Sequence, residues 1–424
     1  MTHSAPRLAP LTVSRGPDVV DVLLPALVAA LDGGPALLPL PDGPKGHREA
    51  VTAALRPDER LDGDAALIVP TSGSTGAPRG VLLPAAAIRA SANATHARLG
   101  GPGRWLLALP STHVAGLMVL ARSAVAGTRP RALDLRHGFD PDEFVTATSQ
   151  LGSDLAARRY TALVPTQLAT LLEVGGKSVA AVAEYDAVLI GGAAAPEALV
   201  ERAREAGVNV VTTYGMTETC GGCVYDGVPV DGVILETAHL EGAHLDATDA
   251  PPADRSAPLC NAHPEATAAQ EDPPQLIRIA GDVLASGYRL RPDLTAQAFS
   301  DGWFQTTDLG SVTNGVLHVT GRADDVAISG GVNVPLDAVD TALAAITGVL
   351  DAATTAVDDS RWGQRIVAVV VPCDPANPPT LESIRSAMCH THPPAYLPRE
   401  LILVPALPLL PTGKIDRRAL ADLL

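Results

Sequence analysis

The order of apolar and polar positions along the chain predicts an α/β protein. Short apolar runs predict buried strands at residues 65–70, 105–109, 160–164, 188–190 and 208–211. Helical patterns alternate with these runs, as at residues 84–99 and 196–206. Such alternation is typical of parallel sheets that helices cover on both faces, and ligands bind these sheets at the carboxyl ends of the strands.

The pattern changes twice toward the C-terminus. Residues 239–274 are rich in Ala, Pro, Asp and His without a clear period, which predicts a long surface loop. Residues 321–334 are dense in Gly, Asp and Asn and predict a junction. Helix and strand patterns then resume at residues 335–346, 352–357, 366–371, 380–390 and 401–404. We therefore expect a large N-terminal domain over residues 1–322 and a small α+β domain over residues 323–424.

Composition and charge narrow the class of protein. Of the 424 residues, 46% are hydrophobic and 18% are charged, which is typical of a globular chain. The net charge of -16 argues against a nucleic-acid or anionic-membrane partner, but a local pocket can still take an anionic small molecule. The N-terminus lacks the apolar region of a signal peptide, and Asp21 and Pro25 interrupt the apolar stretch at residues 19–31. We expect a soluble, cytoplasmic protein.

The five cysteines predict no disulfide framework in a chain of this length. Cys220 and Cys223 form a C-x-x-C pair, for which a redox role or half of a zinc site is one interpretation. The remaining cysteines supply no second such pair. We therefore expect Cys220 and Cys223 to be small packed side chains in a reducing compartment.

The sharpest motif is TSGSTGAPRG at residues 71–80. It follows the first predicted buried strand and precedes the helix predicted at residues 84–99. Its glycines let backbone N–H groups turn toward an anion, and its Ser and Thr hydroxyls add further donors. It is not a Walker A loop, because no Gly-Lys-Ser/Thr follows at the required spacing. A flexible surface turn is the alternative, but so regular a loop after a buried strand favours phosphate binding.

Three further segments place polar groups at the ends of predicted elements. In YGMTET, after the strand at 208–211, Glu218 can hold Mg²⁺ together with phosphate oxygens, or can be a solvated acid at a helix start. Asp308, which a GRADD segment follows at 321–325, can accept both hydroxyls of a ribose or serve as a turn residue. Lys414, in PTGKIDR, is by itself typical of a solvated lysine.

Together and in this order, these segments resemble the adenylate-forming superfamily of acyl-CoA synthetases, adenylation domains and beetle luciferases. The resemblance spans residues 65–418. It implies an α/β fold with a large N-terminal domain of parallel sheets covered by helices, plus a small barrel-like subdomain. It also implies a small α+β C-terminal lid, which rotates about a hinge between adenylate formation and thioester formation.

Within the superfamily, four strings are most similar to the o-succinylbenzoate–CoA ligases of actinobacterial menaquinone biosynthesis. They are LPSTHVAGLMVLARS at 109–123, LVPTQL at 163–168, GGAAAP at 191–196 and TETCGGCVYDG at 217–227. The likeness implies that ATP and Mg²⁺ activate a carboxylic acid, which is then passed to coenzyme A. A ligase for another aromatic or fatty acid, or one that loads a carrier-protein thiol, is the alternative. A non-catalytic nucleotide binder is a third reading, against which the intact Glu218, Asp308 and Lys414 speak.

The resemblance assigns roles residue by residue. It implies that ATP contacts Thr71, Ser72, Gly73, Ser74, Thr75, Gly76, Gly192, Ala193, Thr213, Tyr214, Gly215, Met216, Asp308 and Arg322. The implied catalytic residues are Lys414, Glu218, Thr217 and His113, with Glu218 as the magnesium ligand. The expected acyl-substrate contacts are His113, Arg122, Gly191 and Thr219. The implied hinge is Asp324. The residues expected to border coenzyme A are Ser329, Gly330 and Gly331.

Arg122 is a candidate because of its setting. It interrupts an otherwise apolar helical segment nine residues after His113. o-Succinylbenzoate has two carboxylates, and the one that is not activated needs a partner if it is to leave water. A bidentate clamp by Arg122 is one hypothesis. An arginine that extends to the surface or pairs with an Asp is the alternative.

The chain departs from the superfamily pattern at two places. Arg79 stands where the phosphate loop usually ends in Lys, and a planar guanidinium could change how the loop closes. Gln275-Leu276-Ile277 stands where Gly-Glu-Ile is usual, so the geometry of the barrel-like subdomain could differ. The resemblance also allows a homodimer.

Overall fold

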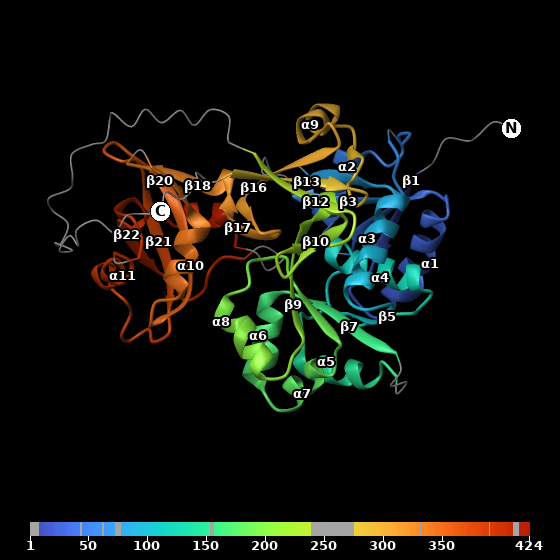
Figure 1. The fold of residues 1–424 in the computed structure, drawn as a ribbon, viewed down its shortest axis with the longest axis horizontal. Coiled ribbons are helices and arrows are strands. Elements are labelled where there is room, and N and C mark those ends of the chain that lie inside the picture. The colour runs from blue at the N-terminus through green and yellow to red at the C-terminus, as the bar shows by residue number, and fades with distance from the viewer. Residues whose placement is uncertain are drawn as a thin grey trace. The chain divides into compact units, whose positions relative to one another are not determined.

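The structure is a computed structural model that describes residues 8–42, 45–61, 63–72, 78–152, 157–238, 275–330, 332–389, 391–409 and 415–424. The side chains of residues 45–47, 72, 324, 333 and 418 lie outside this description, as does the loop predicted at 239–274. Two compact units divide the chain (Figure 1). The first comprises Met1–Leu235, Arg278–Gln305 and Asn314–Leu317, and the second Glu236–Ile277, Thr306–Thr313 and His318–Leu424. The boundary expected after residue 322 stays a prediction.

A seven-stranded sheet in the first unit has the order β11-β10-β9-β8-β7-β5-β6. Its strands are β5 (Gly103–Leu107), β6 (Arg131–Ala132), β7 (Arg158–Leu163), β8 (Ala187–Ile190), β9 (Val210–Met216), β10 (Gly221–Tyr225) and β11 (Val228–Pro229). All pairs from β6 to β9 are parallel, which confirms the predicted sheet type. Strands β10 and β11 extend one edge in the antiparallel direction.

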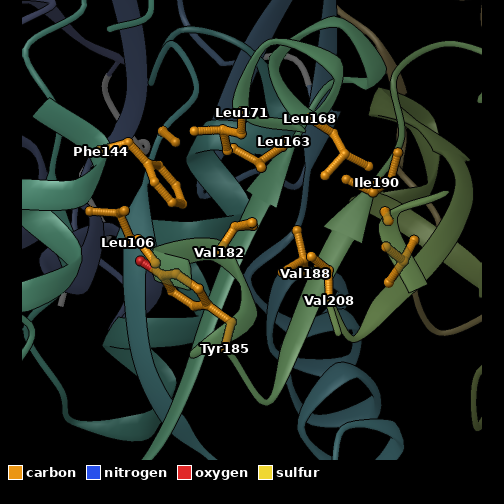
Figure 2. Packing of buried hydrophobic residues seen from close by; sticks show 14 of the residues in the cluster. Leu106, Phe144, Leu163, Leu168, Leu171, Val182, Tyr185, Val188, Ile190 and Val208 are labelled. Atoms are coloured by element: carbon orange, nitrogen blue, oxygen red, sulfur yellow. The ribbon is translucent and has the colours of Figure 1, made fainter. Parts of the chain in front are cut away.

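Helices cover both faces of this sheet (Figure 1). One face carries α5 (Pro141–Ser149), α6 (Pro165–Val174), α7 (Lys177–Ala183) and α8 (Glu197–Glu205), and the other α3 (Ala85–Arg98) and α4 (Val114–Ala126). Side chains alternate along a strand, so Leu106 enters the core under α5 to α8, while Trp105 points to the face of α4. Figure 2 shows the core between this sheet and α5 to α8, where Leu106, Phe144 and Tyr185 pack together.

A second sheet of the first unit has the order β1-β2-β3-β4-β14. Its strands and accompanying helices are β1 (Leu8–Val13), α1 (Val19–Leu31), β2 (Ala36–Pro41), α2 (Lys45–Leu55), β3 (Leu67–Ser72), β4 (Pro78–Leu83) and β14 (Gly287–Tyr288). Strands β1, β2 and β3 are parallel, whereas β4 pairs antiparallel with both β3 and β14.

Strand β4 is an element that the sequence analysis did not predict. It lies between the glycine-rich motif and the helix expected at residues 84–99, and pairs Ser72 with Pro78 and Leu67 with Leu83. The apolar run Val81-Leu82-Leu83 is buried on this strand, and the helix α3 begins at Ala85, as predicted. The motif therefore joins two strands of a hairpin rather than a strand and a helix. Strand β9 also extends beyond the predicted 208–211, because the YGM of the second motif continues it.

A third sheet has the order β12-β13-β16-β15, with β17 paired to β16. Its elements are β12 (Val233–Ala238), β13 (Gln275–Gly281), α9 (Pro292–Ala298), β15 (Phe299–Ser300), β16 (Trp303–Thr313) and β17 (Val316–Arg322). The strand β13 begins at Gln275, so the unusual Gln-Leu-Ile still forms a strand. No helix within the described ranges is long and apolar enough to cross a membrane.

The rest of the second unit is an α+β fold, as predicted. Its sheet has the order β19-β18-β21-β20, with β22 paired to β21. The elements are β18 (Val326–Ser329), β19 (Val332–Pro335), α10 (Leu336–Ala344), β20 (Val349–Asp359), β21 (Gly363–Pro372), α11 (Leu381–Met388), β22 (Glu400–Leu403) and α12 (Arg417–Ala421). A core that includes Val339, Ile366 and Ile384 joins α10 and α11 to one face of this sheet.

Arg417 ties the C-terminal segment of the second unit to three other elements. Its guanidinium lies 3.1 Å from an Asp325 carboxylate oxygen and 3.0 Å from one of Asp340, and also pairs with Asp337. It donates to the Thr354 carbonyl at 2.8 Å as well. One cation thus faces three carboxylates, of which Asp340 is the least exposed. Burial raises the pKa of Asp340 to about 6, although Arg417 and the Thr354 hydroxyl act in the opposite direction.

We predict that Asp340→Asn flattens the pH dependence of stability. The folded state holds the Asp340 proton more tightly than the unfolded chain, so this group favours folding at low pH, and the benefit is lost as the pH rises through about 6. The stability of the wild type relative to the variant should fall by on the order of 2 kcal/mol from about pH 4.5 to pH 7.5. Urea unfolding at the two pH values measures it, and a difference that stays constant or grows would contradict the raised pKa.

Candidate active site

The parallel strands of the seven-stranded sheet bring three predicted segments to one edge. His113 is the residue before α4, a short loop after β5, and Gly191 directly follows β8. Thr217 and Glu218 directly follow β9, in the short helix η1 (Thr217–Thr219). Because β5, β7, β8 and β9 run parallel, their carboxyl ends meet at the same edge, as the sequence pattern predicted.

The η1 turn holds a carboxylate that is nearly closed to solvent. Glu218 is 8% exposed and Thr217 is 9% exposed, so both have lost most of their water. The Tyr288 hydroxyl donates a 2.9 Å hydrogen bond to Glu218 Oε1. Within the described part of the chain, no Arg or Lys forms an ion pair with Glu218. A carboxylate beside a hydroxyl, with no ion-pair partner among the described residues, suits a hard divalent cation that takes its other ligands from phosphate.

Thr219 stabilises the turn itself. Its side chain is fully buried, and its hydroxyl accepts from Met216 N at 3.0 Å and donates to the Gly221 carbonyl at 2.7 Å. Cys220 then takes a left-handed conformation with φ of 51°, which reverses the chain into β10. The backbone therefore uses the hydrogen-bonding capacity of Thr219, the residue that we expected to contact the acyl substrate.

Two glycines allow the edge of the sheet to close tightly. A Cβ on Gly191 would lie 2.2 Å from Thr213 Oγ1, and one on Gly215 would lie 2.1 Å from the Gly221 carbonyl oxygen. The Thr213 hydroxyl donates to the Ile190 carbonyl at 3.2 Å, which links the end of β8 to β9. Gly192 has φ of 83° and Ala193 is exposed, so the predicted adenine-lining residues lie on an open turn. Tyr214 and Met216, half-buried, continue β9 toward η1.

Arg122 is buried on the face of α4 that packs against β10. Val114, Met118 and Arg122 are spaced four residues apart, so they share one face of the helix. A Cβ on Gly221 would lie 3.3 Å from Met118 Cγ and 3.9 Å from Val114 Cγ2. Arg122 makes a long 3.4 Å hydrogen bond to the hydroxyl of Tyr225, four residues after Gly221 on β10. The side chains of Val114 and Met118 thus lie near Gly221, and that of Arg122 lies near Tyr225 further along β10.

Among the described residues, the surroundings of Arg122 show neither of the two alternatives to its role as a substrate clamp. Arg122 is 3% exposed, so it does not extend to the surface, and no carboxylate of the described residues pairs with it. Its Cζ lies 5.1 Å from the ring centroid of Trp105, and its Nε has no hydrogen-bond partner there. Burial, together with the charge of Arg122, lowers the pKa of His96, which therefore stays neutral. A buried cation without an anion is costly, and a ligand carboxylate would remove that cost.

The glycine-rich loop is anchored at both ends by described residues. The Thr71 hydroxyl donates to the Arg79 carbonyl at 3.4 Å, across the β3–β4 hairpin. Arg79 Cζ lies 5.3 Å from the ring centroid of Tyr288. The side chain of Ser72 and the residues Gly73, Ser74, Thr75 and Gly76 lie outside the described part of the chain.

The second unit holds the remaining predicted site residues. Arg322 Nη1 lies 3.4 Å from Asp308 Oδ1, and Arg322 Nη2 donates to the Thr307 hydroxyl at 2.7 Å, so the two predicted ribose-binding residues are brought together. Ser329 is fully buried, and Gly330 takes φ of 61° while its N–H donates to the Trp362 carbonyl at 2.8 Å. Gly331, Lys414 and the side chain of Asp324 lie outside the described part of the chain.

Cys220 and Cys223 are free and fully buried. Burial raises the pKa of both thiols, that of Cys223 to about 12, so neither is a thiolate at neutral pH. This agrees with the expectation that they pack as small side chains.

Tyr225 and Tyr288 are the site residues that the sequence analysis missed. Tyr225 stood within a string quoted for family likeness, but a register shift in β10 between Gly222 and Val224 breaks the alternation of side chains, so the string alone could not place Tyr225 beside Arg122. Tyr288 gave no comparable signal, because it contacts a residue 70 positions earlier.

A family model described as "AMP-binding enzyme" matches residues 18–251, and "AMP-binding enzyme C-terminal domain" matches residues 338–414. The chain belongs to the AMP-binding enzyme family, which confirms the predicted superfamily. It is therefore an enzyme of the adenylate-forming kind.

Among individual proteins, the chain is 45% identical over 405 residues to the "Probable 2-succinylbenzoate--CoA ligase" of Mycobacterium tuberculosis, covering 94% of each chain. It is 31% identical over 376 residues to the "2-succinylbenzoate--CoA ligase" of Geobacillus kaustophilus, covering 85% of this chain and 70% of that protein.

Solved structures agree on the fold. o-Succinylbenzoate CoA synthetase (MenE) from Bacillus subtilis, in complex with the acyl-adenylate intermediate OSB-AMP, superposes with a TM-score of 0.68 at 24% identity. The match covers 94% of this chain and 80% of that chain. The complex of the same protein with ATP and a magnesium ion gives 0.71 at 22% identity, covering 99% and 90%. The predicted fold class is confirmed.

We predict that Gly215→Ala destabilises the sheet edge. The new methyl group would lie 2.1 Å from the Gly221 carbonyl oxygen, so β9 and β10 must separate. We expect a loss of about 1–3 kcal/mol in the free energy of unfolding, measured by urea titration, together with weaker ATP binding.

Gly63→Ala is the matched control. Its Cβ would lie 3.0 Å from the terminal Cδ1 of Leu82, a side chain that can move, and 3.9 Å from Ser286 Oγ, an ordinary contact. Equal losses in the two variants would show that the close approach of β9 and β10 does not constrain the site.

Proposed function

We propose that the chain is an ATP-dependent ligase that joins 2-succinylbenzoate to coenzyme A through an acyl-adenylate. The choice of acid rests on the buried Arg122, a cation with no carboxylate partner among the described residues. Arg122 lies on the same face of α4 as Val114 and Met118, which are near the sheet edge. A diacid supplies one carboxylate for activation and a second for this arginine. The 45% identity to a named 2-succinylbenzoate ligase supports the same choice.

The reaction is limited by charge repulsion. A carboxylate oxygen of the acid attacks the α-phosphorus of ATP, and the bond to pyrophosphate breaks. Two anions must approach each other, so catalysis consists mainly of positioning and charge stabilisation. Mg²⁺, when bound, would neutralise phosphate charge, and the buried carboxylate of Glu218 with the Thr217 hydroxyl fits it. We assign further phosphate contacts to Thr71 and the glycine-rich loop, and Lys414 to the acyl carboxylate and α-phosphate.

The second half-reaction exchanges the leaving group. The thiol sulfur of coenzyme A attacks the acyl carbon, and AMP leaves with the electrons of the broken bond. In the proposal Asp308 and Arg322 hold the ribose, since their side chains already lie together. Asp324 is the proposed hinge, with Ser329, Gly330 and Gly331 along the path of the thiol. His113 stands at the start of α4, between the acyl and thiol sites in this proposal.

The main rivals are a ligase for a monocarboxylic aromatic or fatty acid, and an enzyme that loads a carrier protein. A pyrophosphate-release assay with a panel of acids, with and without coenzyme A, separates them. The proposal expects 2-succinylbenzoate to be the best acid and coenzyme A to be required for thioester formation. A better rate with a fatty acid would overturn it. We also propose a cytoplasmic location, where ATP and coenzyme A are supplied, and retain the homodimer as an expectation.

We predict that Arg122→Leu removes the preference for the diacid. The KM for 2-succinylbenzoate should rise by roughly tenfold or more, which corresponds to about 1.4 kcal/mol or above. The KM for ATP should be unchanged. A monoacid analogue, in which hydrogen replaces the carboxylate that is not activated, should show little change, because it has no group for Arg122.

Arg129→Leu is the control for this experiment, since Arg129 is exposed and pairs only at the surface with Asp21. Thermal unfolding shows whether Arg122→Leu remains folded. A folded Arg122→Leu variant that keeps the wild-type ratio of KM values for diacid and monoacid would refute the role of Arg122 in binding the second carboxylate.

We predict that Lys414→Ala slows adenylate formation by on the order of 10²–10³, the usual effect of losing one transition-state donor. Thioester formation from preformed acyl-adenylate should be spared. Rapid-quench assays of each half-reaction measure both rates, with Lys177→Ala on the surface of α7 as the control. If the variant makes adenylate at the wild-type rate, the role of Lys414 is misassigned.

A further inference from the structure

Residues 285–289 form a segment that we call the Glu218 clamp, because it holds this residue by both main chain and side chain. Ala285 N donates to the Glu218 carbonyl at 2.8 Å, and the Tyr288 hydroxyl donates to Glu218 Oε1 at 2.9 Å. In between, the clamp pairs antiparallel with β4, Gly287 opposite Leu82 and Tyr288 opposite Val81. It therefore links the strand after the glycine-rich loop to the turn that carries Glu218, within one unit.

The far end of the clamp is fixed by Arg289. This side chain is 1% exposed, and its guanidinium donates to the carbonyls of Leu55, Arg56, Glu59 and Arg60 at 2.5–3.2 Å. The backbone N–H of Arg289 donates to the Gly80 carbonyl at 2.8 Å. Neutral carbonyls thus satisfy this cation, so it anchors the clamp without drawing on the charge of Glu218.

The Tyr288 hydroxyl is suited to orient a carboxylate without neutralising it. The phenol hydroxyl is an uncharged donor, and its hydrogen bond to Glu218 Oε1 is 2.9 Å long. An arginine or lysine in the same place would also orient Glu218, but would cancel most of its attraction for a cation. A neutral donor holds the side-chain rotamer and leaves the full negative charge available.

Arg79 covers the ring of Tyr288. Its Cζ lies 5.3 Å from the ring centroid, close enough for a cation–π contact. The planar guanidinium can stack on a ring face in a way that an ammonium group cannot. The arginine that departs from the superfamily pattern therefore has a local partner, and the row Arg79, Tyr288, Glu218 connects the flank of the glycine-rich loop to the buried carboxylate.

We infer that Tyr288 is a positioning residue that holds Glu218 in the orientation in which it binds the divalent cation accompanying ATP. The inference rests on the proposed function, because it takes Glu218 as a ligand of that cation. It assigns to Tyr288 a contribution to cation binding beyond its packing against Phe299 in the same unit.

The test is Tyr288→Phe, which removes one oxygen and keeps the ring. Calorimetric titration with ATP, in Mg²⁺ and in EDTA, separates the cation-dependent part of the affinity from the rest. We expect the Mg²⁺-dependent gain in ATP affinity to fall roughly tenfold, as for other groups that orient metal ligands, and the affinity in EDTA to be unchanged. The Mn²⁺ affinity of the ATP complex, followed by electron paramagnetic resonance, should fall by the same factor.

Tyr185→Phe is the matched control. Tyr185 is also a buried tyrosine whose hydroxyl has a single side-chain partner, Thr148 at 2.8 Å, and it lies in the core under α5 and α7. This variant should bind Mg²⁺ and ATP as the wild type does.

Two results would overturn the positioning role. One is an unchanged Mg²⁺ dependence in Tyr288→Phe, and the other is an equal loss of ATP affinity in Mg²⁺ and in EDTA. A wild-type protein that binds no ATP in Mg²⁺ would instead refute the proposed function itself, so the two failures are distinguishable.

Discussion

The parallel pairing of β5, β7, β8 and β9 is the constraint on which the rest of the first unit depends. Parallel neighbours bring their carboxyl ends to one edge, so segments that are about 100 residues apart in the sequence meet there. The pairing requires both faces to be covered, and apolar residues alternate toward α5–α8 and toward α3 and α4. Gly191 and Gly215 then allow the strand ends to approach more closely than any side chain would permit.

Two buried arginines, Arg122 and Arg289, and the half-buried Arg417 show how this acidic chain uses its cations. Carbonyl oxygens surround Arg289, and carboxylates surround Arg417. Among the described residues, Arg122 contacts a tyrosine hydroxyl at a long distance and the face of an indole. An uncompensated charge away from water is costly in free energy. A chain with a net charge of -16 has many acidic residues that could pair with a buried arginine. The arginine left without a carboxylate among the described residues is the one on the face of α4 assigned to the acyl substrate.

The buried carboxylate of Glu218 poses the opposite problem. It must remain charged to attract a cation, yet it must not rotate freely. The structure meets both needs with the neutral Tyr288 hydroxyl, which donates to Glu218 Oε1 and adds no positive charge. The same segment joins β4, so the loop assigned to phosphate and the carboxylate assigned to the metal share one support.

The sequence by itself determined the features that depend on neighbours along the chain. Glycine-rich and Ser/Thr-rich strings show where backbone donors gather, and the apolar periods show the parallel strands. The isolated Arg122 in an apolar helix suggested a buried charge as one of two hypotheses. Even the expected packing of Cys220 and Cys223 follows from their lack of further ligands. The family likeness extended these local signals to residues that the structure does not describe, such as Lys414 and the glycine-rich loop.

Only the tertiary structure decided which distant groups touch. The strand β4 was missed because its six residues form a strand only by pairing with β3 and β14. The Tyr288–Glu218 contact spans 70 residues, and the cluster around Arg417 draws Asp325, Asp337 and Asp340 to one side chain. Such contacts depend on sheet register and on how loops close, and a pattern of single residues carries neither. Local chemistry could therefore be predicted from the sequence, whereas the partners that tune it could not.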